Sequence, residues 1–194
     1  MRLQDMGSLA VWEVAGPSVR RFLINTLFDS TFMLLGIVVG SAFTAKINPL
    51  VVVTTMTTSS LALGISTGVS VYEAENLEQE RGIAKMERGM LKDLGDTFIE
   101  KRAKTITTLT SIINFFTPLF ACSVMVLPFV FVNTGILKME WASWAAILLA
   151  LMMLFMTGAY MGKIGNKNPW LKGLRMTGFG IIAFIIGRLI YSLL

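Results

Sequence analysis

The sequence contains no histidine and one cysteine among its 194 residues. Without histidine, the commonest metal ligand and the usual general base are both missing. The lone cysteine, Cys122, lies in an apolar stretch, so the chain has neither an internal disulfide nor a thiolate metal site. The sequence also has no phosphate-binding glycine loop and no nucleophile beside a base. We therefore expect that the protein is not an enzyme.

Charged residues are also scarce, at 15% of the chain, whereas 54% of the residues are hydrophobic. The mean hydropathy of +0.68 is typical of a chain whose main solvent is lipid. A net charge of +5 suggests nucleic acid, but the basic residues lie at the ends of apolar runs, where membrane proteins place them. We therefore expect the lipid bilayer as a partner and no nucleic acid.

Five apolar runs are long enough to cross a bilayer as helices, which takes about 20 residues each. Residues 73–104 are predicted to form a cytoplasmic helical hairpin that stops at Gly95 and resumes with Asp96 as N-cap. We therefore predict an all-α integral membrane protein, with residues 1–194 as a single transmembrane domain. The predicted spans cover about residues 22–45, 49–72, 105–132, 141–162 and 172–194.

The basic residues are distributed unequally between the two sides of the predicted membrane. Fourteen of the 17 Lys and Arg residues lie before the first span, between the second and third, or between the fourth span and the start of the fifth, where Lys172 and Arg175 are counted. Because cationic loops are retained in the cytoplasm, we predict a cytoplasmic N-terminus and an external C-terminus. The segment up to about residue 16 is either a short helix along the interface or a frayed tail.

Asp29 lies about eight residues inside the first span, or about 12 Å at 1.5 Å per residue. Such a group is costly in lipid unless it faces protein or water. Asn25, Met33, Gly36 and Gly40 share its helix face, and the two glycines allow another helix to approach closely. Asp29 and Met33 are therefore candidate metal ligands facing another helix, unless Asp29 only hydrogen-bonds a neighbour.

The second span carries a polar stretch at residues 54–60, followed by small residues at Ser60, Gly64 and Gly68. Hydroxyl groups of this kind can line a wet path, and Met56 offers a thioether to a transition metal. The alternative is structural, because Ser and Thr usually bond to carbonyls of their own helix and small residues usually pack.

A row of carboxylates follows on the predicted hairpin. At about 100° per residue, Glu73, Glu80 and Glu87 fall on one stripe that borders an apolar stripe. Glu75 and Met86 lie on the other border of the apolar stripe. Converging carboxylates are what an oxygen-ligand site for a divalent cation needs, so these five residues are candidate metal ligands. A solvated charged helix is the alternative.

The order of two spans, an acidic helical insert and three further spans resembles the vacuolar iron transporter family, in its compact prokaryotic branch. The most specific match is Gly158–Lys163 with Asn168–Gly180, which is similar to that family's passage from the fourth to the fifth span. Asn25–Ser30 is similar to the family's Asn-Asp-Gly segment in span one. The resemblance covers roughly residues 20–194.

This resemblance implies a homodimer joined through span one, in the cell membrane of a prokaryote. It would move Fe²⁺, or Mn²⁺, out of the cytosol in exchange for protons, with the metal as transported substrate and no permanently bound cofactor. Asp29 would be the membrane carboxylate of the metal path. Glu73, Glu80 and Glu87 would belong to the site that collects the metal.

The sequence departs from the family near the end of span two. Family members usually carry Ser-Met and then Gly-Glu-aromatic, whereas this chain reads Ser66–Ser70 there, without the methionine and the glutamate. The insert also has room for a hairpin but not for a separate three-helix metal-binding domain. These departures favour an alternative function, a non-transporting membrane scaffold that uses the charged hairpin to bind a partner.

Overall fold

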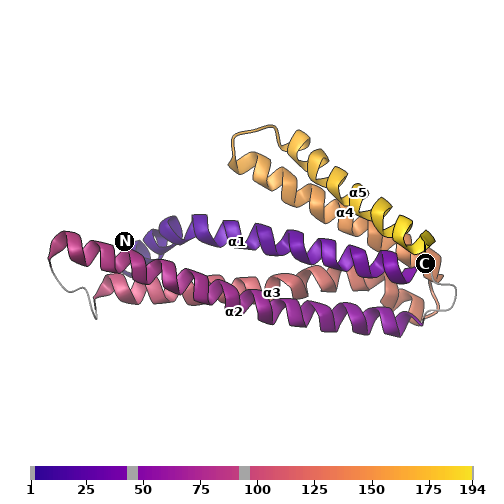
Figure 1. The fold of residues 1–194 in the computed structure, drawn as a ribbon, viewed down its shortest axis with the longest axis horizontal. Coiled ribbons are helices and arrows are strands. Elements are labelled where there is room, and N and C mark those ends of the chain that lie inside the picture. The colour runs from indigo at the N-terminus through magenta and orange to yellow at the C-terminus, as the bar shows by residue number, and fades with distance from the viewer. Residues whose placement is uncertain (1–2, 43–47, 92–96, 194) are drawn as a thin grey trace. The chain divides into compact units, whose positions relative to one another are not determined.

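The computed structural model describes residues 3–42, 48–91 and 97–193, and every regular element in these ranges is an α-helix (Figure 1). Each of the helices is long and apolar enough to cross a membrane. This confirms the predicted all-α class with five helices of membrane-spanning length, while the cytoplasmic place of the hairpin stays a prediction. The helices are α1 (Leu3–Ala42), α2 (Pro49–Met90), α3 (Phe98–Asn133), α4 (Met139–Ile164) and α5 (Pro169–Leu193).

The helices pack into two compact units. The first unit comprises Met1–Asn25 and Gly64–Thr117, and the second comprises Thr26–Leu63 and Pro118–Leu194. Helices α1, α2 and α3 each contribute to both units, while α4 and α5 lie wholly in the second.

In the second unit, α4 and α5 form a tight antiparallel pair (Figure 1). A Cβ atom added to Gly162 would come within 2.7 Å of the Cα of Pro169, and one added to Gly173 within 3.0 Å of the carbonyl oxygen of Phe155. Glycine is therefore required for this close approach of the two backbones. The turn between the helices includes Asn166 with a φ of 49°, a left-handed conformation that Asn tolerates.

The core of the second unit is apolar and takes side chains from four helices. Its centre is filled by Leu34 and Val38 of α1, by Met56 of α2, and by Met125 and Phe129 of α3. Small residues of α4 let that helix approach this cluster, and they are Ala142, Ala146 and Ala150.

In the first unit, α2 and α3 pack along a seam of small residues. A Cβ atom at Gly64 would meet the carbonyl oxygen of Phe115 at 2.6 Å. The Ser111 hydroxyl donates a 2.7 Å hydrogen bond to the carbonyl oxygen of Gly68, one turn further along. The stripe of small residues in the second span is thus a helix-packing surface, as the structural alternative predicts.

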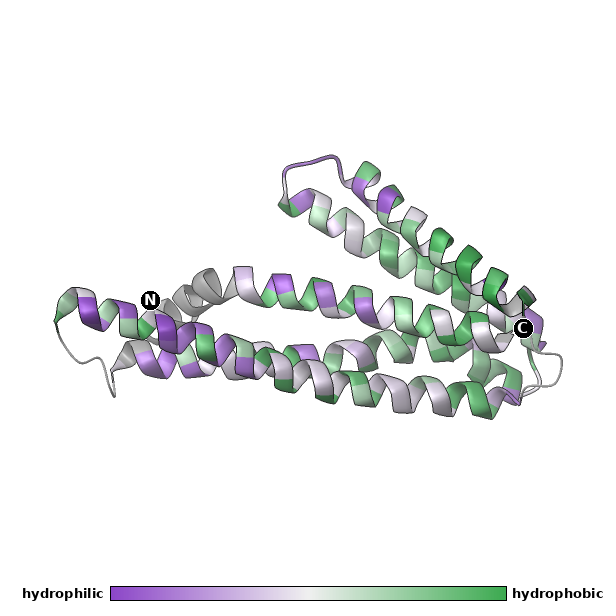
Figure 2. Cartoon of the chain, viewed as in Figure 1, coloured by the Kyte–Doolittle hydropathy of each residue, from purple (hydrophilic) through white to green (hydrophobic). Residues whose placement is uncertain are grey.

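The polar part of this pair lies at the end of α2 and the beginning of α3, where Figure 2 shows hydrophilic residues gathered on both helices. Helix α2 ends at Met90, and Leu91 has a φ of 51°. The predicted stop at Gly95 and cap at Asp96 lie outside the described residues. At the other end of the chain, α1 is helical from Leu3 and contains Pro17, so the N-terminal segment belongs to the same helix as the first span, and its place along the interface stays a prediction.

Candidate metal-binding residues

Asp29 lies on an open face of α1. Asn25, Gly36 and Gly40 on the same face are exposed as well, and a Cβ atom at either glycine would meet nothing within 4 Å. No described residue covers this face, and its contact with another helix stays a prediction. None of the hydrogen bonds and ion pairs made by the described residues involves Asp29.

The opposite face of α1 carries small polar residues whose hydroxyl groups are satisfied locally. The buried Thr31 hydroxyl donates to the carbonyl oxygen of Leu27 at 2.7 Å, and Ser30 donates to the carbonyl oxygen of Thr26. Local bonds of this kind let a hydroxyl enter an apolar core without an unpaired donor. Asp29 has no such arrangement, which separates it from the structural polar residues of its helix.

The two candidate methionines belong to the apolar packing of the second unit. Met33 is half-buried against the core, and Met56 is 0% exposed within it. The threonines beside Met56 bond to their own helix, with Thr57 donating to Val53 at 2.8 Å and Thr58 to Thr54 at 2.8 Å. In this conformation Met56 fills core volume, the ordinary role of methionine.

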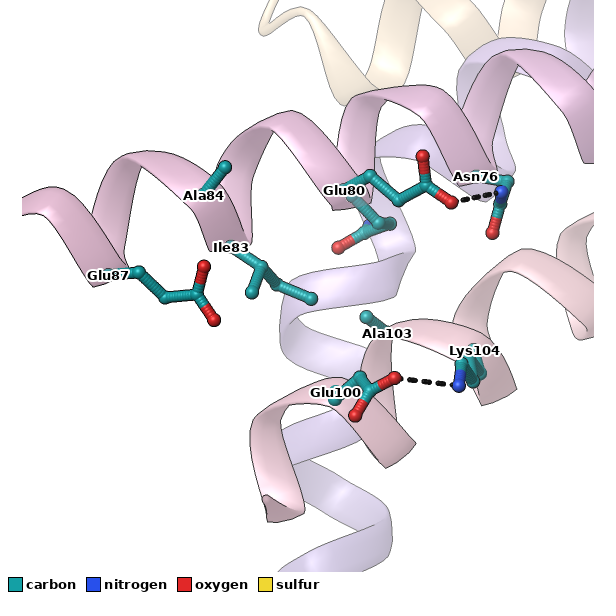
Figure 3. A pocket seen from close by; sticks show the side chains of 9 residues that line it. Asn76, Glu80, Ile83, Ala84, Glu87, Glu100, Ala103 and Lys104 are labelled. Atoms are coloured by element: carbon teal, nitrogen blue, oxygen red, sulfur yellow. Dashed lines mark hydrogen bonds and ion pairs between the residues drawn. The ribbon is translucent and has the colours of Figure 1, made fainter. Parts of the chain in front are cut away.

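Three carboxylates border one cavity of about 310 Å³ between α2 and α3 in the first unit (Figure 3). Glu80 and Glu87 reach it from α2, and Glu100 reaches it from the first turn of α3. Asn76 Nδ2 donates to Glu80 Oε1 at 2.8 Å, and Lys104 Nζ pairs with Glu100 Oε1 at 2.7 Å. The remaining lining residues are Gln79, Ile83, Ala84 and Ala103.

Only part of the predicted carboxylate row borders this cavity. Glu80 and Glu87 are brought together, whereas Glu73 lines a separate, mainly apolar groove closer to the middle of α2. Glu100 was missed from the sequence. The sequence places Glu100 just before the third predicted span, on the same side of the membrane as the other glutamates. It does not give the register between α2 and α3, which brings Glu100 to the same cavity as Glu80 and Glu87.

Glu75 and Met86 occupy different environments. Glu75 is only 3% exposed and accepts a 2.9 Å hydrogen bond from Gln79 Nε2, while Met86 is exposed. A buried carboxylate requires hydrogen bonds or a cation to offset its loss of water. Glu75 therefore has the least access to solvent among the described carboxylates of the predicted hairpin.

Within the described part of the chain, no group of three Asp, Glu, His or Cys side chains could hold a metal ion as arranged. A divalent cation such as Mn²⁺ prefers several converging oxygens. The carboxylates at the border of the cavity therefore do not by themselves form a complete coordination shell for a metal ion.

Five helices long and apolar enough to cross a bilayer define the class, a helical membrane protein. A model of the VIT family matches residues 87–191, slightly more than half of the chain. The chain belongs to the VIT family, whose members are metal-ion transporters. The match covers Glu87 and Glu100 but not Glu80 or Asp29.

A further similarity extends over most of the sequence. The chain is 24% identical over 176 residues to an uncharacterized protein of the archaeon Methanocaldococcus jannaschii. The aligned region covers 89% of this chain and 88% of that protein. The two chains therefore correspond over nearly their whole lengths.

Proposed function

We propose that this protein is a homodimeric transporter that exports a divalent metal ion, Fe²⁺ or Mn²⁺, from the cytosol in exchange for protons. Membership of the VIT family supports metal-ion transport as the class of function. The metal, the direction, the proton coupling and the dimer are parts of the proposal. The metal is the substrate that passes through the protein.

The observation that carries the proposal is the exposure of Asp29 on a membrane-spanning part of α1. A carboxylate facing hydrocarbon is strongly disfavoured, so this face requires either protein or water against it. Gly36 and Gly40 leave room beside Asp29 for another helix. A second copy of α1 supplies that helix in the proposal, because a two-fold axis brings the same face of both copies together.

Such a dimer places two Asp29 carboxylates near one axis inside the membrane. Two carboxylates there bind either a divalent cation or protons, and both compete for the same oxygens. Binding of one then releases the other, which is the simplest coupling device for antiport. Met33, half-buried on the neighbouring turn, is near enough in sequence to add a thioether to this site.

The acidic cavity of the first unit would collect the metal before it reaches Asp29. Glu80, Glu87 and Glu100 border that cavity and lie on the predicted cytoplasmic side. Ligands from water or from a second subunit would complete the coordination that one chain lacks.

Metal flux into reconstituted vesicles tests the proposal. Vesicles containing the protein, with an outward-directed or an inward-directed proton gradient, are mixed with Mn²⁺ or Fe²⁺, and the metal entering is measured with an internal fluorescent chelator. We expect flux above that of empty vesicles and a change in rate when the gradient is reversed. Flux equal to that of empty vesicles would favour the scaffold function, and flux independent of the gradient would remove the proton coupling.

A further inference from the structure

A second hollow of the first unit, distinct from the acidic cavity, lies between α2 and α3. It is a groove of about 490 Å³ whose walls are mostly apolar. Ile65 and Val69 of α2 face Ile112 and Phe116 of α3 across it. All four side chains are exposed, and Val69 reaches 58%. The groove is therefore open, and no described residue fills it.

The groove lies within stretches of α2 and α3 that are apolar enough to span the membrane. Its floor is the helix seam, where Ser111 donates to the Gly68 carbonyl oxygen at 2.7 Å, so that hydroxyl donor is already engaged. Hydrocarbon is the medium around a membrane-spanning segment. A groove with these walls at this place is complementary to a lipid acyl chain.

One end of the groove is polar and is formed by Tyr72 and Glu73 of α2. Tyrosine is enriched where the hydrocarbon meets the lipid headgroups, since its ring is apolar and its hydroxyl is polar. The exposed carboxylate of Glu73 beside it attracts a cationic group and repels a phosphate. The polar end therefore has the chemistry of a headgroup position.

A positive charge lies near the same end. Lys104 precedes Ser111 by seven residues, which puts the two on nearly the same face of α3, about 10.5 Å apart along the axis. In the antiparallel register set by the Ser111–Gly68 bond, Lys104 is level with the turn of α2 that follows Glu73. Its side chain remains 69% exposed although it pairs with Glu100.

We propose that this groove binds one membrane phospholipid with an ammonium headgroup, such as phosphatidylethanolamine. The acyl chain lies between Val69 and Ile112, the phosphate faces Lys104, and the ammonium faces Glu73. Each charge of the zwitterionic headgroup thus faces a protein side chain of opposite charge. A phosphatidylglycerol of the same chain length lacks the cationic group and meets Glu73 without compensation.

Native mass spectrometry of the full-length protein in mild detergent tests the site. The protein is titrated separately with phosphatidylethanolamine and phosphatidylglycerol that carry identical chains. We expect one phosphatidylethanolamine bound per chain with at least about tenfold higher affinity than phosphatidylglycerol. The variant Val69→Trp, which fills the groove, should lose this adduct.

The matched control for that variant is Val51→Trp, because Val51 is on the same helix, is 55% exposed and does not line the groove. Ile112→Trp fills the same groove from α3 and serves if Val69→Trp fails to give folded protein by size exclusion. Equal lipid retention in the groove-filling and control variants would overturn the proposal. A change in oligomeric mass without a change in lipid binding would also overturn it, by assigning the groove to a second chain.

The two headgroup contacts are tested separately. Glu73→Gln should reduce the preference for phosphatidylethanolamine over phosphatidylglycerol, whereas Lys104→Gln should weaken binding of both lipids. Lys138→Gln, an exposed lysine of the α3–α4 connection, is the control and should change neither. Equal binding of both lipids by the unmodified protein, with no effect of Glu73→Gln, would overturn the assignment of the ammonium to Glu73.

Discussion

A Cβ atom at Gly64 would lie 2.6 Å from the carbonyl oxygen of Phe115, so the second and third helices approach as closely as a glycine permits. The obstacle is backbone rather than a flexible side chain, and a larger residue must separate the helices. This contact fixes the register that carries both hollows of the first unit. It also makes Gly64 a sensitive position for stability.

We predict that Gly64→Ala destabilises the protein by about 1–3 kcal/mol, the usual cost of overpacking a tight contact. The measurement is the thermal unfolding midpoint in detergent. Gly178→Ala is the control, because a Cβ atom there would meet nothing within 4 Å. Alanine favours a helix over glycine by up to about 1 kcal/mol, so the control should hold or raise the midpoint. An unchanged midpoint for Gly64→Ala would mean that the helices separate without cost.

We predict that replacing Gly36 and Gly40 together with Leu weakens the dimer, since the bulky side chains would separate paired α1 helices. Both glycines are open in the single chain, so folding of the monomer should be unaffected. Analytical ultracentrifugation in detergent over a range of protein concentrations measures the association. Gly178→Leu in α5 is the control. A parent protein that is monomeric at every concentration contradicts the proposed dimer outright.

We predict that Asp29→Asn abolishes gradient-driven metal flux while leaving fold and dimer intact. Asn keeps the size and most of the hydrogen bonding but cannot hold the charge that binds metal and proton in turn. Flux is measured in vesicles and divided by the amount of dimer recovered by size exclusion. Glu140→Gln, which removes an exposed carboxylate from the first turn of α4, serves as control. Near-normal flux in well-folded Asp29→Asn protein would remove this residue from the mechanism.

We predict that the triple variant Glu80→Gln, Glu87→Gln and Glu100→Gln weakens Mn²⁺ binding at least about tenfold, because each change removes a carboxylate from the same cavity. Isothermal titration calorimetry on the purified protein measures the affinity. Glu78→Gln is the control, since Glu78 is exposed and does not border the cavity. Equal affinities of parent and triple variant would assign these carboxylates to ordinary solvation.

We predict that the end of α2 and the α4–α5 turn lie on the cytoplasmic side, from the distribution of Lys and Arg. Met90 is exposed, so a cysteine at this position should react with an impermeant maleimide in inverted vesicles but not in intact cells. The background variant is Cys122→Ala, and a cysteine at Lys138 should show the opposite pattern. Labelling of position 90 from outside intact cells would reverse the topology.

The sequence by itself determined the spans and the all-helical class. Long apolar runs report on helix length and on the surrounding lipid, and both are properties of consecutive residues. The open face of Asp29, Gly36 and Gly40 was predictable for the same reason, because residues three and four apart share a helix face whatever the helix contacts.

Which carboxylates meet was decided only by the tertiary structure. Glu73, Glu80 and Glu87 share one stripe of α2, yet Glu73 lies on the apolar groove while Glu80 and Glu87 border the acidic cavity with Glu100. That division depends on how far α3 is displaced along α2. The displacement is set by close contacts such as Gly64 with Phe115 and Gly68 with Ser111, which join residues more than 40 positions apart. Periodicity within one helix carries no information about that register, because register is a property of two helices packed together.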